Sequence, residues 1–203
     1  MTIKRIGIFG GSFDPPHNAH FFCVRLAAEY LQLEKVLVVP AFIQPLKPIG
    51  PSAPPELRWK MVCSLVKGDQ LFQPVRWELE KKGISYTIDT VLRAVHKYPP
   101  SEWELFLIVG SDAWKEWNSW REGERIIELV KVAVLRRAGF PIIIEESLKD
   151  RVIEIPNPIW EISSTFLRQR VREGLSIKWA VPPAVEKIIL QEALYQPSIY
   201  DYP

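Results

Sequence analysis

The sequence predicts an α/β protein with a mostly parallel, doubly wound sheet and helices on both faces. Three observations support this prediction. Short apolar runs alternate with amphipathic segments, a glycine-rich turn directly follows the first apolar run, and the chain has neither internal repeats nor low-complexity segments. In such a Rossmann-like sheet, ligands bind beyond the carboxyl ends of the strands, where the strand order reverses. We therefore expect the functional site there.

The first part of the chain shows this alternation element by element. Apolar runs predict strands, and apolar residues at helical spacing predict helices. Proline in the first turn of a helix costs no hydrogen bond, so a helix can begin at the pair of prolines 54 and 55. The predicted elements are, in order, a strand at 3–9, a helix at 19–31, a strand at 35–39, a helix at 54–66 and a strand at 72–79. Six prolines between Pro40 and Pro55 predict a long ordered loop or a mobile lid.

The second part continues in the same way. A strand that ends in glycine follows a helix with a clear apolar stripe, and two shorter strands and three helices complete the chain. These elements are a helix at 87–98, a strand at 104–110, a helix at 122–130, strands at 132–136 and 152–155, and helices at 165–173 and 183–194.

Length and composition limit the kind of protein. A chain of 203 residues fits a single domain over residues 1–203, with a C-terminal helical segment at about 164–195. The net charge of +2 gives no reason to expect nucleic acid or a membrane as a partner, although a small anionic ligand fits. Cys23 and Cys63 lack the spacing of zinc or disulfide sites, which predicts two buried, reduced thiols. Without a signal or spanning segment at the N-terminus, we expect a cytoplasmic protein.

The stretch GGSFDPPHNAH, residues 10–20, is the first motif that predicts chemistry. Gly10 and Gly11 allow the backbone to approach a ligand, and the amides at the start of the next helix can face an anion. His17 and His20 are three residues apart, so on a helical first turn both can donate to the same phosphates. The alternatives are that one histidine caps the helix while the other packs, or that both bind a metal. Neither a dinucleotide fingerprint nor a P-loop is present.

The stretch ISSTFLRQR, residues 162–170, is the second motif. Ser163, Ser164 and Thr165 offer hydroxyls and amides at a helix N-terminus, and Arg168 lies one turn further on. Such a group can receive a triphosphate tail. The alternative is a plain helix cap with a solvated arginine.

Together the two motifs resemble the GxFDPxHxxH and ISSTxxR signatures of the nucleotidylyltransferase superfamily. Three further segments and the C-terminal end are similar to the bacterial-type nicotinate mononucleotide adenylyltransferases over nearly the whole chain. These segments are SYTIDT (85–90), GSDAWKEW (110–117), LRRAGF (135–140) and the ending AVPPAVEKIILQEALY.

The resemblance implies roles for individual residues. His17, His20 and Arg168 would be catalytic and grip the ATP phosphates. The residues that it assigns to ATP are Gly10, Gly11, Ser12, Phe13, His17, His20, Asp112, Ser163, Ser164, Thr165 and Arg168, with Asp112 on the ribose. Those that it assigns to the acceptor are Lys47 and Arg137 for phosphates, Thr87 for the pyridine carboxylate and Trp120 for stacking on the pyridine ring. Asp112 as a turn or cap carboxylate and Trp120 as a core or rim residue remain alternatives.

The implied reaction transfers AMP from ATP to nicotinate mononucleotide and releases pyrophosphate. Its cofactor would be Mg2+, held mainly by ATP phosphates, with no metal ligand and no nucleophile from the protein. Alternatives are a dual-specificity enzyme, an enzyme for another acceptor such as pantetheine phosphate, and a nucleotide-binding sensor without turnover. A homo-oligomer is left open. The chain departs from the family at Ala19, at Leu46 and at Ala138; Leu46 replaces a family histidine, so the role of its loop stays open.

Overall fold

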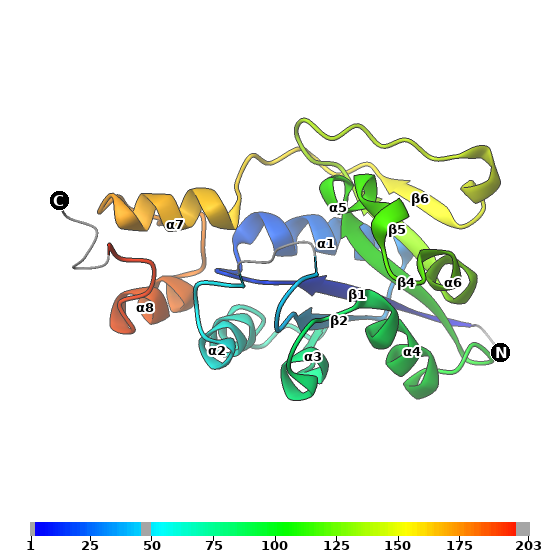
Figure 1. Ribbon diagram of the computed structural model, residues 1–203, viewed down its shortest axis with the longest axis horizontal. Helices are drawn as coiled ribbons and strands as arrows, with labels where there is room; N and C mark the ends of the chain where they lie inside the picture. Colours follow the sequence, from blue (N-terminus) through cyan, green and yellow to red (C-terminus); the bar gives the residue numbers. More distant parts are fainter. Residues whose placement is uncertain (1–2, 46–49, 198–203) are drawn as a thin grey trace.

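Six parallel strands form one sheet in the computed structural model, which describes residues 3–45 and 50–197 (Figure 1). The strand order is β3-β2-β1-β4-β5-β6, so the chain winds outward from β1 in one direction and from β4 in the other. This doubly wound order confirms the predicted fold class and places the reversal between β1 and β4. The strands are β1 (Lys4–Gly11), β2 (Lys35–Pro40), β3 (Phe72–Pro74), β4 (Trp103–Gly110), β5 (Lys131–Leu135) and β6 (Val152–Ile155).

Helices cover both faces of the sheet (Figure 1). Most of them begin and end within a few residues of the predicted bounds. They are α1 (Asn18–Leu31), α2 (Pro55–Leu65), α3 (Trp77–Lys81), α4 (Thr87–Lys97), α5 (Ser111–Lys115), α6 (Gly123–Leu129), α7 (Ser164–Arg172) and α8 (Pro183–Gln191), with short 3-10 turns η1 (Trp117–Ser119) and η2 (Glu146–Leu148). Within the described residues, no helix combines the length and apolar character needed to cross a membrane.

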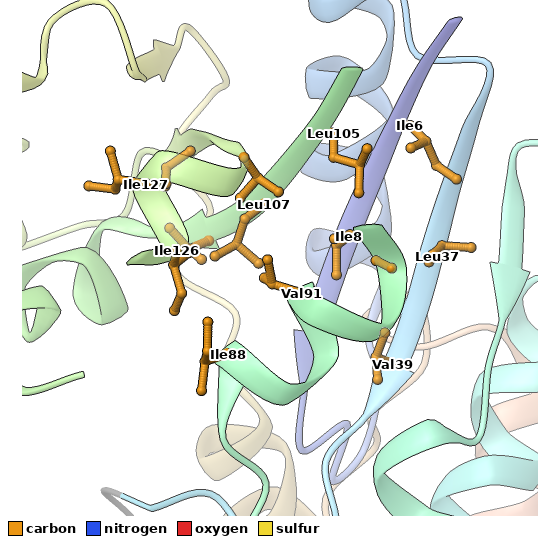
Figure 2. Close-up of a cluster of buried hydrophobic side chains, with 14 of the residues drawn as sticks. Ile6, Ile8, Leu37, Val39, Ile88, Val91, Leu105, Leu107, Ile126 and Ile127 are labelled. Carbon is orange, nitrogen blue, oxygen red and sulfur yellow. The ribbon is translucent and has the colours of Figure 1, made fainter. Parts of the chain in front are cut away.

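Side chains alternate between the two faces of each central strand, and both faces are buried. Ile6 and Ile8 of β1 lie in the cluster under α4 and α6, whereas Phe9 lies in the cluster under α1. Figure 2 shows the first cluster, in which Ile88 and Val91 of α4 pack over the strands. Because neither face is open to solvent, a ligand can reach the sheet only at its ends.

One predicted strand is wrong. Residues 72–79 form only the short strand β3, and the chain then turns into helix α3. β3 is an edge strand, and Pro74 has no N–H to continue a ladder. Trp77 and Leu79 are nevertheless buried, which explains why the stretch has the apolar character of a strand. The short helix α5 after β4 was not predicted.

The C-terminal helices have a small core of their own. Leu167 of α7 and Val185 of α8 pack with Met61 of α2, in what we call the C-terminal cluster. α7 and α8 lie at one end of the molecule, beyond the sheet (Figure 1). This position of α7 places the second motif, residues 162–170, in contact with the first motif, residues 10–20. Of the two thiols, Cys23 is buried as predicted, whereas Cys63 is only half-buried.

Candidate active site

The candidate site lies where β1 ends and α1 begins, beside the reversal in strand order. His17 is the residue before α1, and its Nδ1 accepts the backbone N–H of His20 over 3.4 Å. The two rings are stacked, with centroids 3.5 Å apart and planes 20° apart. His17 therefore caps the helix, as one alternative expected, and the two histidines also lie together, as the phosphate hypothesis requires.

The cap determines which nitrogen of His17 can serve a ligand. Because Nδ1 accepts a hydrogen bond, the proton of the neutral ring lies on Nε2. Nε2 has no hydrogen-bond partner within the described part of the chain, and the side chain is only 1% exposed. Burial, and next the Arg137 guanidinium, lower the pKa of His17 to about 3. The ring is thus a neutral, prearranged hydrogen-bond donor.

This lowered pKa predicts a pH dependence of stability. Unfolded His17 takes up a proton near pH 6.5, whereas folded His17 does so only near pH 3, so stability is lost as pH falls between these values. From pH 7 to pH 5 the loss due to this residue is about 2 kcal/mol. The free energy of unfolding in urea, measured at both pH values, should show this loss in the wild type but not in His17→Asn. The control variant His96→Asn, at an exposed position of α4, should lose as much stability as the wild type. An equal loss in His17→Asn would contradict the prediction.

A pocket opens beside the histidines. Its wall comes from the first motif, from the ends of β4 and β5 and from the segment before α7, and Ala19 is part of it. The lining residues are Phe9, His17, Ala19, His20, Cys23, Gly110, Leu135, Arg136, Arg137, Trp160 and Ile162. Arg137 also borders a second, wider pocket of about 370 Å³ between the ends of β5 and β6. Arg136 and Arg137 are the residues that line both pockets.

Asp112 and Arg137, expected to bind different parts of the substrates, pair with each other. Arg137 Nε lies 3.2 Å from Asp112 Oδ1. The backbone N–H of Arg137 donates to the buried Ser111 hydroxyl over 3.0 Å. Gly110 makes room for this pair, since a Cβ there would lie 2.3 Å from Asp112 Oδ1 and 2.7 Å from Arg137 Nε. Asp112 does not cap α5, for which no side-chain cap is found. Its side chain is 41% exposed and lies beside Arg137, which lines the pocket.

The second motif contacts the first directly. Ser163 caps α7 by accepting the Phe166 N–H over 3.2 Å, and Ser164 Oγ donates to the Pro15 carbonyl over 2.8 Å. Arg168 donates to the Asp14 carbonyl over 2.9 Å and to Thr165 Oγ1 over 3.2 Å. Two segments about 150 residues apart thus form one surface, with hydroxyls, a guanidinium and two helix N-termini.

Two of the residues expected at the acceptor, Thr87 and Trp120, belong to segments on the face of the sheet opposite α1, whereas Arg137 lines the pocket beside the histidines. Thr87 begins α4, and Trp120 follows η1 half-buried against the core, with its ring 5.7 Å from that of Trp117. The guanidinium of Arg121 lies 4.8 Å from the ring centroid of Tyr86, so the two segments meet. Lys47, also expected here, lies outside the described residues, as does Leu46.

Arg58 is a site-forming residue that the sequence reading missed. It is fully buried, and its guanidinium donates to backbone carbonyls of the first motif and of the proline-rich loop. These carbonyls are those of Ser12, Ala41, Phe42 and Ala53. The sequence does contain one indication that Arg58 is buried. It lies three and four residues before the buried Met61 and Val62, so it shares their face of the helix.

The sheet order and the joined motifs define the chain as a Rossmann-like nucleotidyltransferase. A family model described as cytidylyltransferase-like matches residues 8–170. The chain belongs to this family and, within it, to the nicotinate-nucleotide adenylyltransferases, which confirms the resemblance inferred from the motifs.

Two relatives and two solved structures illustrate the match. A Thermus thermophilus protein named "Probable nicotinate-nucleotide adenylyltransferase" is 41% identical over 192 residues, which cover 95% of this chain and 100% of that one. A Clostridium beijerinckii protein of the same name is 36% identical, with coverages of 96% and 100%. Two structures of Plasmodium falciparum nicotinic acid mononucleotide adenylyltransferase, complexed with NaAD and with APC, give TM-scores of 0.75 and 0.74 at 23% and 21% identity. Each covers 95% of this chain and 97% of its own, and supports the fold.

Proposed function

We propose that the chain transfers AMP from ATP to nicotinate mononucleotide, giving nicotinate adenine dinucleotide and pyrophosphate for NAD biosynthesis. The observation that carries the proposal is the junction of the two motifs: Arg168 reaches Asp14 beside the stacked rings of His17 and His20. The names of relatives at 36–41% identity over nearly the full length support the choice of acceptor.

The chain's part in this reaction is to position two polyanions and to stabilise the charge that develops between them. A phosphate monoester is already anionic near neutral pH, so its attack on the α-phosphorus needs no strong base. Nε2–H of His17 donates to a phosphate oxygen, and His20 binds the ATP phosphates beside it. Arg168 neutralises the triphosphate tail. Gly10, Gly11, Ser12 and Phe13, with the three hydroxyl residues of the second motif, line the ATP site.

The site also fits a magnesium ion that arrives on ATP. Two carboxylates at the site are engaged by the protein, because Asp14 accepts hydrogen bonds and Asp112 pairs with Arg137. Mg2+ usually keeps several waters and binds through substrate phosphates. When bound, it neutralises charge on the leaving pyrophosphate.

On the acceptor side, we assign the pyridine nucleotide to the start of α4. The N-cap residue Tyr86 makes no side-chain cap hydrogen bond within the described part of the chain, so the Thr87 amide can donate to the pyridine carboxylate, while Trp120 stacks on the ring. Arg137 and Lys47 neutralise phosphates. We assign all these groups to a single domain over residues 1–203 that works in the cytoplasm; light scattering decides between a monomer and a homo-oligomer.

The test is incubation of the purified protein with ATP, Mg2+ and one acceptor at a time. The acceptors are nicotinate mononucleotide, nicotinamide mononucleotide, pantetheine phosphate and flavin mononucleotide, and the readouts are pyrophosphate release and product mass. We expect transfer to nicotinate mononucleotide and none without an acceptor. Product from another acceptor alone would reassign the substrate, and ATP binding without product from any would indicate a sensor.

Arg168→Ala should raise the KM for ATP more than the KM for the acceptor, because the lost charge faces the triphosphate tail. Steady-state kinetics with each substrate varied in turn measure both constants. Arg172→Ala, which removes an exposed arginine from the last turn of the same helix, is the matched control and should change neither. Equal increases in both KM values would assign Arg168 a general structural role.

A further inference from the structure

The segment after α8 returns to the first motif. The hydroxyl of Tyr195 donates to Asp14 Oδ1 over 2.8 Å. Its side chain is 9% exposed and packs in the C-terminal cluster with Ala53 and Leu167. Burial, and next the charge of Asp14, raise the pKa of Tyr195, so the hydroxyl keeps its proton and acts as a donor.

Asp14 is a buried carboxylate whose two oxygens are both held. Its side chain is 5% exposed. Oδ2 accepts the Ser52 N–H over 2.7 Å, and Oδ1 accepts the Ala53 N–H over 2.9 Å in addition to the Tyr195 hydroxyl. A buried carboxylate is tolerated only with such partners, so removing one of them disturbs the orientation of the whole group.

Arg168 depends on the same aspartate. Its Nη1 donates to the Asp14 carbonyl and lies 3.9 Å from Asp14 Oδ2, while Nη2 reaches Thr165. The side chain keeps 24% of its surface exposed, so it can still meet a ligand. The position of this guanidinium is therefore defined by Asp14 on one side and by Thr165 on the other.

We propose that Tyr195 is a positioning residue for ATP: its hydroxyl orients Asp14, and Asp14 holds Arg168 where the triphosphate tail is received. This proposal rests on the assignment of Arg168 to ATP in the proposed function. It adds Tyr195, in the segment after α8, to the residues that support the ATP site. Tyr195 acts on the Asp14 carboxylate through a hydrogen bond, and Arg168 meets Asp14 through its backbone carbonyl and through the 3.9 Å ion pair with Oδ2.

Tyr195→Phe tests the proposal, since it removes the hydroxyl and keeps the ring in its cluster. The Kd for ATP with Mg2+, measured by calorimetry without an acceptor, should rise about three- to thirtyfold, while the KM for the acceptor stays unchanged. The matched control is Tyr98→Phe, at another buried tyrosine, which packs against Trp103 in the cluster under α4. It should leave the Kd for ATP unchanged.

The same substitution in an Arg168→Ala background separates positioning from general stability. There Tyr195→Phe should have no further effect on ATP binding, because the group that it positions is gone. An unchanged Kd in the wild-type background, or an equal rise in both backgrounds, would overturn the proposal. If Tyr195→Phe does not fold, Asp14→Asn serves in its place under the same two criteria.

Failure of this inference is distinguishable from failure of the proposed function. A wild-type protein that binds ATP but transfers nothing to nicotinate mononucleotide contradicts the proposed function alone, because the calorimetric test needs no acceptor. A wild-type protein that performs the transfer, with a Tyr195→Phe variant that binds ATP equally well, contradicts the role of Tyr195 alone.

Discussion

His17→Ala should lower kcat by at least about 100-fold while the protein stays folded. The substitution removes a neutral N–H donor that is prearranged at the phosphates, and single donors of this kind contribute about 100- to 1,000-fold to kcat. Pyrophosphate release at saturating ATP and acceptor measures the effect, and circular dichroism checks the fold.

The capping role of His17 requires a second variant. Asparagine is among the best N-cap residues, so His17→Asn keeps an acceptor for the His20 N–H but has no donor at the position of Nε2. We expect kcat to fall about as far as in the alanine variant. A near-normal kcat in His17→Asn would show that the residue serves the helix and not the reaction.

The second large effect concerns the choice of acceptor. The kcat/KM for nicotinate mononucleotide should be about 10- to 150-fold higher than the kcat/KM for nicotinamide mononucleotide. A carboxylate only accepts hydrogen bonds, which suits the Thr87 amide, whereas a carboxamide brings an NH2 group that needs an acceptor. Hydrogen bonds to charged groups contribute about 1.5–3 kcal/mol, which corresponds to this range. Arg121, over the ring of Tyr86, adds positive charge beside Thr87.

Both nucleotides should be measured side by side at saturating ATP. Arg121→Met removes the charge and should narrow the preference, whereas Arg125→Met, at an exposed arginine of α6 that pairs with Glu122, should not. Equal kcat/KM values in the wild type, or a preference for the amide, would overturn the assignment of this pocket. Adenylyl transfer itself would remain.

The sheet was predictable because its strands are buried on both faces. β1, β2 and β4 are nearly continuous apolar runs, which mark strands independently of their neighbours in space. The prediction of a strand at 72–79 was wrong because Trp77 and Leu79 would be buried on a strand as well as on a short helix. Periodicity over eight residues, interrupted by Pro74, could not distinguish the two.

The site was predictable only as far as its motifs are local. The sequence predicted which residues within each motif act together. The hydrogen bonds between the motifs, from Ser164 to Pro15 and from Arg168 to Asp14, became visible only in the structure. The partners of Asp14 could not be read from the sequence, because Tyr195 reaches it only after α8 has packed against α2. Likewise, the mutual pairing of Asp112 and Arg137 depends on β4 and β5 being neighbours.

The glycine at the end of β4 restricts how this protein can change over evolutionary time. Since a methyl group at Gly110 would overlap the carboxylate of Asp112 and the side chain of Arg137, alanine there would require both side chains to shift. A descendant can therefore gain a side chain at this position only together with a rearrangement of the ion pair. Substitutions at these three positions should be inherited together, and single exchanges at Gly110 should be rare among working descendants.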